Sequence, residues 1–129
     1  MQRGQIPPEW LARLRVLCLE LPATYEEAAW AGTRWMIGKR NFAHAVMIED
    51  GWPPAYARAA GAPGPLAVLT FRVPLADGGS TRFRQRPYFK PPWWPDIAGI
   101  GLAADTDWSE VSTHVITSYR LLAPKALLR

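Results

Sequence analysis

Cysteine, histidine and long apolar runs are all scarce in this chain. The single cysteine, Cys18, has no second cysteine for an internal disulfide, and its leucine neighbours in a predicted helix indicate a buried, unreactive thiol. Arginine, glutamate or proline interrupts each apolar segment before it reaches the roughly 20 residues that a membrane-crossing helix needs. The first residues, Met1 to Gln5, lack the apolar region of a secretory signal. We therefore expect a cytoplasmic protein that does not cross a membrane.

Sequence motifs for catalysis and metal binding are also absent. There is no glycine-rich phosphate loop, no Gly-x-Ser-x-Gly elbow and no cysteine with a histidine nearby in the sequence. His44 and His114 lie far apart, and neither has a metal-ligand spacing to cysteine, aspartate or glutamate. Turns and helix starts explain the neighbouring acids, which are Glu26/Glu27, Glu49/Asp50 and Asp105/Asp107. We expect no catalytic residue, no metal and no cofactor.

The composition is that of one folded domain spanning residues 1–129. Hydrophobic residues make up 49% of the chain, and seven residues are tryptophan, which disfavours a disordered protein. The formal charge of +4, from 15 basic and 11 acidic residues, is compatible with nucleic acid or an acidic partner but also with plain solubility. The location of the charges therefore matters more than their sum.

Two helices are predicted, one near each end of the chain. Apolar residues recur at helical spacing from Trp10 to Leu21, with prolines suited to a first turn before them and Pro22 after them. Asp107 and Glu110 have the spacing of a capping box, and a second apolar stripe follows them until Pro124.

Four strands are predicted between these helices. Residues 33–37 and 42–48 form a hairpin through 38–41, with Phe42, His44, Val46 and Ile48 on one face of its second strand. Residues 66–73 and 97–102 form two more strands, the last of which carries Gly99 and Gly101 on a bare face that a helix or an aromatic ring can approach closely. The order of helix, antiparallel strands and helix, without βαβ repeats, predicts an α+β two-layer sandwich: a small antiparallel sheet covered by the N-terminal and C-terminal helices.

Two connecting segments are less regular. The segment 49–65 is rich in glycine, proline and alanine and lacks clear periodicity, so it is either mobile or used for a function, and a mobile loop is the favoured interpretation. The segment 80–86 fits either a short helix capped by Ser80 or an extended strand, and the extended form would align Arg82, Arg84 and Arg86 on one face.

Several short motifs carry a resemblance to a known family. The segment Cys18–Pro22, followed by Glu26, Glu27 and Trp30, resembles the opening of the MmcQ/YjbR-like proteins, where a helix ends at Leu-Pro before acidic residues. The segments 88–92, 99–102, 107–111 and 118–125 are similar to the family's closing strand and final helix in order and spacing. The resemblance covers most of residues 14–125.

The resemblance implies a CyaY-like α+β fold, shared distantly with frataxin, and a double-wing arrangement proposed to bind DNA. The link to frataxin also suggests iron binding, which the resemblance associates with an acidic ridge along the first helix. Here Glu9 and Glu20 are offset by Arg13 and Arg15 in that helix, so iron delivery is not expected.

The main candidate surface is basic. If the first hairpin and the segment before the last strand meet at one end of the sheet, their cations converge and give weak, salt-sensitive, sequence-independent contacts to DNA phosphates. An ordinary solvated surface is the alternative. The residues are Arg34, Lys39, Arg40, Arg82, Arg84, Arg86 and Lys90.

An aromatic group suggests a second possibility, a pocket for a small molecule or a protein partner. Its residues are His44, Tyr88, Phe89, Trp93 and Trp94. The same rings also fit ordinary core packing or a rigid lid over the sheet edge.

Overall fold

A computed structural model describes residues 5–77 and 80–128 of the chain. Residues 1–4, part of the segment in which we found no secretory signal, lie outside this description. The strands are β1 (Thr24–Ala28), β2 (Thr33–Ile37), β3 (Arg40–Ile48), β4 (Leu66–Arg72), β5 (Tyr88–Phe89) and β6 (Ile97–Leu102). The helices are α1 (Pro8–Leu19), α2 (Pro54–Ala60) and α3 (Trp108–Leu122), with 3-10 turns η1 (Leu75–Asp77), η2 (Thr81–Arg84) and η3 (Lys125–Leu128).

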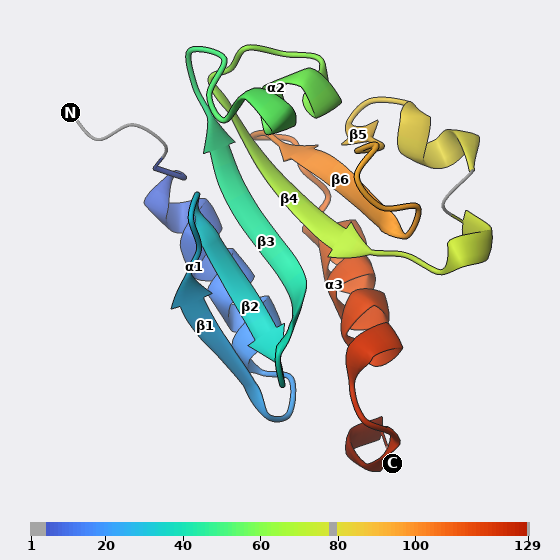
Figure 1. Ribbon diagram of the computed structural model, residues 1–129. Helices are drawn as coiled ribbons and strands as arrows, with labels where there is room; N and C mark the ends of the chain where they lie inside the picture. The colour runs from blue at the N-terminus through green and yellow to red at the C-terminus, as the bar shows by residue number, and fades with distance from the viewer. Residues whose placement is uncertain (1–4, 78–79, 129) are drawn as a thin grey trace.

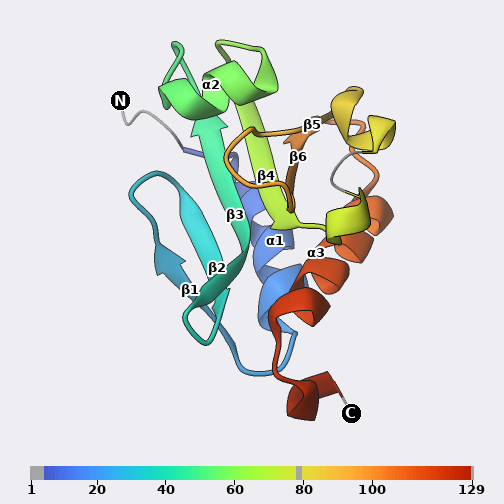
Figure 2. The same ribbon diagram turned by 45° about the vertical axis from the view of Figure 1, so that its right-hand side comes forward.

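The six strands form one antiparallel sheet in the order β1-β2-β3-β4-β6-β5. Helices α1 and α3 pack against one face, and the shorter α2 lies against the other (Figures 1 and 2). The main core lies between the sheet and α1 and α3, with Trp35, Leu69 and Val115 fully buried in it. The predicted α+β sandwich is therefore confirmed. None of the helices in the described part of the chain has the length and apolar character required to cross a membrane.

Both predicted terminal helices are confirmed. In α1, Leu14 and Cys18 are fully buried, as the apolar stripe predicts. In α3, the Asp107 side chain accepts hydrogen bonds from the amides of Ser109 and Glu110 at 3.0 and 3.3 Å. These bonds satisfy amides that have no partner inside the helix, so they fix where α3 begins.

A bulge in β3 corrects the predicted facing of Phe42. Trp35 of β2 pairs with Ala43, and Met36 pairs with Asn41, so Phe42 is an extra residue in the ladder. Its ring therefore turns into the main core, 5.6 Å from the ring of Tyr119 on α3. Val46 and Ile48, expected on the same face as Phe42, lie in the separate cluster beneath α2.

Strand β1 was missing from our sequence-based prediction because its residues are mostly polar. It forms an edge of the sheet, where side chains can reach water or charged partners. Glu26 accepts hydrogen bonds from Arg15 and from the indole N–H of Trp35, both about 3 Å long. These contacts connect the edge strand to α1 and β2 and replace the apolar pattern that usually identifies a strand.

The segment 49–65 is not a loop throughout, because it holds helix α2, which our prediction lacked. Helix α2 starts with proline in its first turn and ends at Gly61, whose φ of 68° is left-handed. Tyr56 and Ala57 of α2 pack against the cluster that contains Val46 and Ile48. Seven residues are too few to show a clear helical period in the sequence.

The segment 80–86 adopts the helical alternative. The Ser80 side chain accepts a hydrogen bond from the amide of Arg82, which caps the 3-10 turn η2. Phe83 of this turn is buried in the main core, and the chain then enters the short edge strand β5. This turn positions the basic residues discussed next.

Candidate functional site

The predicted basic residues do not converge on one rim. Lys39 and Arg40 lie at the turn between the inner strands β2 and β3, whereas η2 and β5 lie at the β5 edge of the sheet (Figure 1). The condition for a single basic surface is therefore not met, because two inner strands, β4 and β6, separate the two groups. The error arose because sequence does not reveal the strand order.

Several of these cations are also engaged within the molecule. Arg34 forms an ion pair with Glu27, and Arg82 Nη2 lies 3.0 Å from Glu110 Oε1. Lys90 Nζ donates to the carbonyl oxygens of Pro91 and Trp94 at 3.1 and 2.8 Å. Partial burial, followed by the nearby Arg84 guanidinium, lowers the pKa of Lys90.

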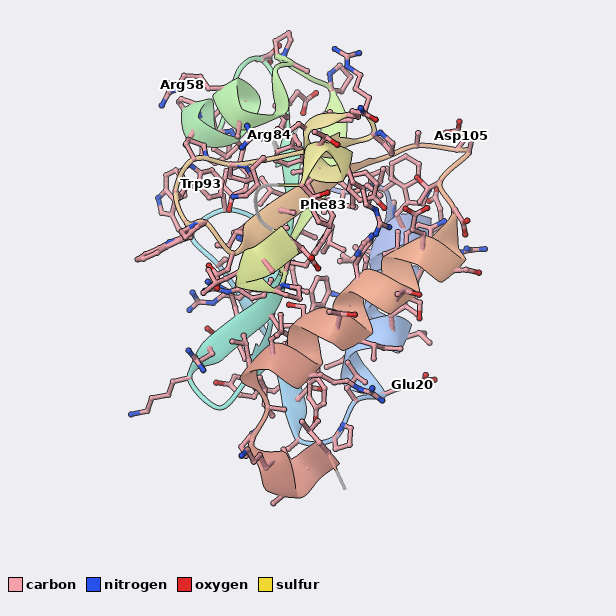
Figure 3. All side chains as sticks on the ribbon, turned by 90° about the vertical axis from the view of Figure 1, so that its right-hand side faces the viewer. Glu20, Arg58, Phe83, Arg84, Trp93 and Asp105 are labelled. Atoms are coloured by element: carbon pink, nitrogen blue, oxygen red, sulfur yellow. The ribbon has the colours of Figure 1, made fainter. Side chains whose placement is uncertain are left out.

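Arg84 and Arg86 differ from these residues. Both are exposed, and neither side chain has a hydrogen bond or ion pair with another residue in the ranges 5–77 and 80–128. Figure 3 shows Arg84 on the same side of the molecule as α2 and Trp93, whereas Asp105 lies on the other side, near the start of α3. Arg84 and Arg86 are thus the predicted cations at this edge that are available for a ligand.

His44 belongs to the packing of α2 on the sheet. Its Nε2 lies 2.6 Å from the carbonyl oxygen of Ala31, and the Tyr56 hydroxyl lies 2.9 Å from its Nδ1. Burial lowers the pKa of His44, so the neutral ring is favoured, with Nε2–H donating to Ala31 and Nδ1 accepting from Tyr56. Trp93 then packs edge-to-face on Tyr56 at 4.7 Å. The rings of His44 and Trp93 thus both pack against the ring of Tyr56.

The predicted aromatic group therefore does not line one pocket. Tyr88 and Phe89 are neighbours in β5 and point to opposite faces, Tyr88 into the main core and Phe89 into the cluster beneath α2. Trp94 is 59% exposed. Trp30, which our prediction did not include, is 80% exposed and lies 5.4 Å from Trp52.

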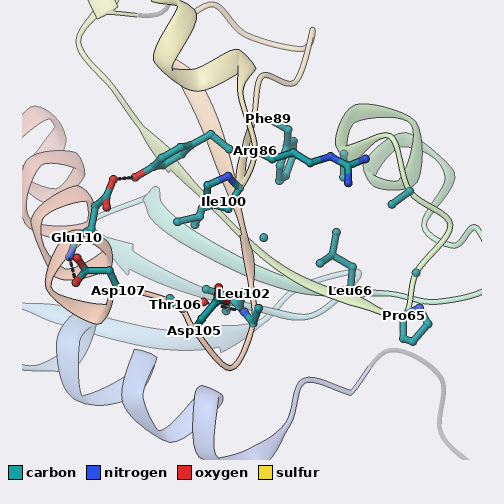
Figure 4. A pocket seen from close by; sticks show the side chains of 17 residues that line it. Pro65, Leu66, Arg86, Phe89, Ile100, Leu102, Asp105, Thr106, Asp107 and Glu110 are labelled. Atoms are coloured by element: carbon teal, nitrogen blue, oxygen red, sulfur yellow. Dashed lines mark hydrogen bonds between the residues drawn. The ribbon is translucent and has the colours of Figure 1, made fainter.

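A cavity of about 680 Å³ lies at the edge formed by β5 and β6. Tyr88 and Phe89 line it, so part of the aromatic prediction lies at this cavity, but His44, Trp93 and Trp94 are not among its lining residues. Its apolar wall comes mainly from Pro65, Leu66, Ile100 and Leu102, as Figure 4 shows. Its charged residues are Arg86, Asp105, Asp107 and Glu110.

One wall of the cavity is built on a cluster of polar side chains. The Tyr88 hydroxyl donates to Glu110 Oε1 and lies 2.7 Å from Nε2 of His114, and Arg82 Nη2 lies 3.3 Å from the same nitrogen. The hydrogen bonds from Tyr88 and then Arg82 lower the pKa of Glu110, so its carboxylate is ionised at neutral pH.

The same cluster favours a neutral tyrosine and a neutral histidine. Burial raises the pKa of Tyr88 to about 12. Burial, followed by the Arg82 charge, lowers the pKa of His114, whose ring stacks on Phe71 at 4.7 Å. Sequence reasoning missed this cluster, because only the i, i+4 spacing of Glu110 and His114 on α3 marks it and their partners lie in η2 and β5.

Comparison with known proteins supports the fold alone. No family model matches the chain, and no curated protein matches it. The structure is similar to the crystal structure of a protein from Pseudomonas syringae determined as a structural genomics target, with a TM-score of 0.62 and 12% sequence identity. The match covers 90% of this chain and 98% of that one. The likeness to the MmcQ/YjbR-like proteins stays a prediction.

Proposed function

We propose that this protein is a small-molecule binding domain whose site is the cavity between β5, β6, α2 and the start of α3. The cavity volume of about 680 Å³ carries the proposal. Ligand sites usually measure about 300–1,000 Å³ and combine apolar walls with a few polar groups. This cavity has that composition, with Leu66 and Leu102 on its apolar side and Arg86 and Glu110 as charged groups.

The walls are held in place before any ligand arrives. Ile100 and Leu102 belong to β6, which pairs with β4 along its whole length. Glu110 is fixed by Tyr88 and Arg82, and Asp107 by its bonds to the first turn of α3. A preformed wall lowers the entropy that a ligand loses on binding.

A titration monitored by two-dimensional amide NMR tests the proposal. A panel of small compounds, each with an apolar body and one or two polar groups, is added to the full chain. We expect at least one compound to shift the amides of Leu66 and of residues 100–103. A panel that leaves these amides unchanged at millimolar concentration would contradict the proposal.

A matched pair of variants locates the binding. Ala103 and Ala104 are neighbouring exposed residues, but only Ala103 lines the cavity. Ala103→Trp places a large ring at the cavity and is expected to weaken binding, whereas Ala104→Trp is expected to leave it unchanged. Equal effects of both variants would place the binding elsewhere.

A second candidate function is weak binding of nucleic acid at the same sheet edge. It is favoured by the exposed guanidinium groups of Arg84 and Arg86, which have no ion-pair partner in residues 5–77 and 80–128. The resemblance to MmcQ/YjbR-like proteins agrees with this candidate. Arg34 and Arg82 are paired with carboxylates, and Lys39 and Arg40 lie beyond β4 and β6 at the β2–β3 turn, so the interface is smaller than the sequence suggested.

A further inference from the structure

The charged groups of the cavity are segregated, which bears on the kind of ligand that the proposed function requires. Figure 4 shows the Arg86 guanidinium extending toward α2, and the carboxylate of Glu110 on the other side of Ile100. Asp105 and Asp107 accompany Glu110 at the start of α3. The cavity therefore has a basic end and an acidic end with apolar side chains between them.

The acidic end is arranged to receive a cation. Tyr88 and Arg82 both contact Oε1 of Glu110, and Oε2 has no hydrogen-bond partner in residues 5–77 or 80–128. The Asp107 carboxylate already accepts hydrogen bonds from the amides of Ser109 and Glu110 at the start of α3. These two amides are therefore not available to bind a ligand anion. A ligand anion placed here would face carboxylates, and an ammonium group would be attracted to them.

The basic end is arranged to receive an anion. Arg86 is exposed and has no carboxylate partner within the described ranges, so its guanidinium keeps its full hydrogen-bonding capacity. A planar guanidinium binds a carboxylate through two parallel hydrogen bonds. Arg84, two positions earlier in the chain, is also exposed but does not line the cavity, which makes it a matched control.

We infer that the cavity takes a dipolar compound, with an ammonium group at the Glu110 end, a carboxylate at the Arg86 end and an apolar body between them. A simple organic acid brings no cation to the acidic end, and a simple amine brings no anion to the guanidinium of Arg86. A compound with an ammonium group at one end and a carboxylate at the other complements both ends of the cavity. Such an arrangement of charges discriminates against ligands with a single charge.

Three probes with the same apolar chain test this inference on the full-length protein: 6-aminohexanoate, hexanoate and hexylamine. Binding is followed by amide NMR at low salt in a buffer without carboxylates. 6-Aminohexanoate makes a charge-assisted contact at both ends of the cavity, whereas each single-charge probe makes such a contact at one end. It is therefore expected to bind at least about tenfold more tightly than either of them.

Variants assign each charge to its wall. Arg86→Gln is expected to reduce the affinity for 6-aminohexanoate to that for hexylamine, and Arg84→Gln is expected to have no effect. Glu110→Gln keeps an oxygen that can accept from the Tyr88 hydroxyl. It is expected to weaken the binding of 6-aminohexanoate and hexylamine but not that of hexanoate. Asp105→Asn, which leaves the α3 cap intact, is a second test of the acidic end should Glu110→Gln disturb folding.

The possible results separate this inference from the proposed function on which it rests. If hexanoate or hexylamine binds as tightly as 6-aminohexanoate and shifts the amides of residues 100–103, the cavity is a binding site but the dipolar inference is wrong. If none of the three probes shifts these amides, the inference is also overturned, and the wider compound panel decides the proposed function by itself.

Discussion

The ring of Phe89 in β5 lies directly over Gly99 in β6. The two residues are paired in the sheet, and a Cβ atom added to Gly99 would lie 2.2 Å from Cζ of Phe89. The contact holds a two-residue edge strand against β6, with the Phe89 ring occupying the space above Gly99. Because β5 also supplies Tyr88 to the cavity, this contact positions one wall of the proposed site.

Substitution of Gly99 tests the contact. Gly99→Ala is expected to lower the free energy of unfolding by about 1–3 kcal/mol, because the Phe89 ring must move to make room for the methyl group. Urea denaturation measures the change. Gly101→Ala is the control, since its added carbon would meet the flexible end of Leu66 at 3.3 Å and the Pro87 carbonyl oxygen at an ordinary contact distance of 3.6 Å. Equal losses in the two variants would show that the ring contact is not the cause.

Ser118 joins α3 to two strands. Its hydroxyl donates to the Phe42 carbonyl at 2.6 Å and accepts from the Arg72 amide at 2.8 Å, and the residue is fully buried. Ser118→Ala is expected to cost about 1–3 kcal/mol, because both backbone groups lose a partner. Thermal and urea unfolding measure this loss. Ser112→Ala, on the same helix, is expected to change stability by less than about 0.5 kcal/mol; a similar loss there would contradict the account.

The two histidines should make the stability of the protein depend on pH. Burial lowers the pKa of both His44 and His114 in the folded protein, so the unfolded chain binds protons more readily below its ordinary histidine pKa of about 6.5. The free energy of unfolding should therefore fall as the pH drops from 7 toward 5, by at most about 1.4 kcal/mol per pH unit for each histidine. Urea titrations at several pH values measure the slope.

Replacement of the histidines provides the control for this slope. His44→Gln and His114→Gln should each remove part of the pH dependence, whatever they do to the stability at pH 7. A slope that persists in the double variant would assign the effect to other groups.

The nucleic-acid candidate makes a prediction about salt. Two phosphate contacts, from Arg84 and Arg86, would give a slope of about −1.8 in a plot of log affinity against log salt concentration. Fluorescence anisotropy with duplex DNA at several salt concentrations measures it. The variant Arg84→Ala with Arg86→Ala should lose binding, whereas Lys39→Ala with Arg40→Ala should largely retain it. The absence of binding at low salt, or binding unchanged by the double substitution of Arg84 and Arg86, would eliminate this candidate.

Much of the fold was predictable because its signals are local. The Asp107 cap, the hairpin through residues 38–41 and the bare face of Gly99 each depend on neighbouring residues or on an element's own periodicity. Strand β1 was missed because polar side chains satisfied by Arg15 and Trp35 hide its pattern, and the facing of Phe42 was wrong because a bulge reverses the alternation.

The candidate site was less predictable because it depends on contacts between distant segments. Tyr88 and Phe89 were identified as aromatic candidates, but their separation to opposite faces follows from their place in a strand that the sequence did not indicate. The pairing of Tyr88 and Arg82 with Glu110 joins residues 22 and 28 positions apart. Similarly, the separation of the basic residues follows from the strand order.

The most direct test of the central claim is a crystal structure of the protein in complex with 6-aminohexanoate. The account predicts electron density for the compound in the cavity, with its carboxylate at Arg86 and its ammonium group at Glu110. A complex in which the compound binds elsewhere while the cavity holds only water would contradict it.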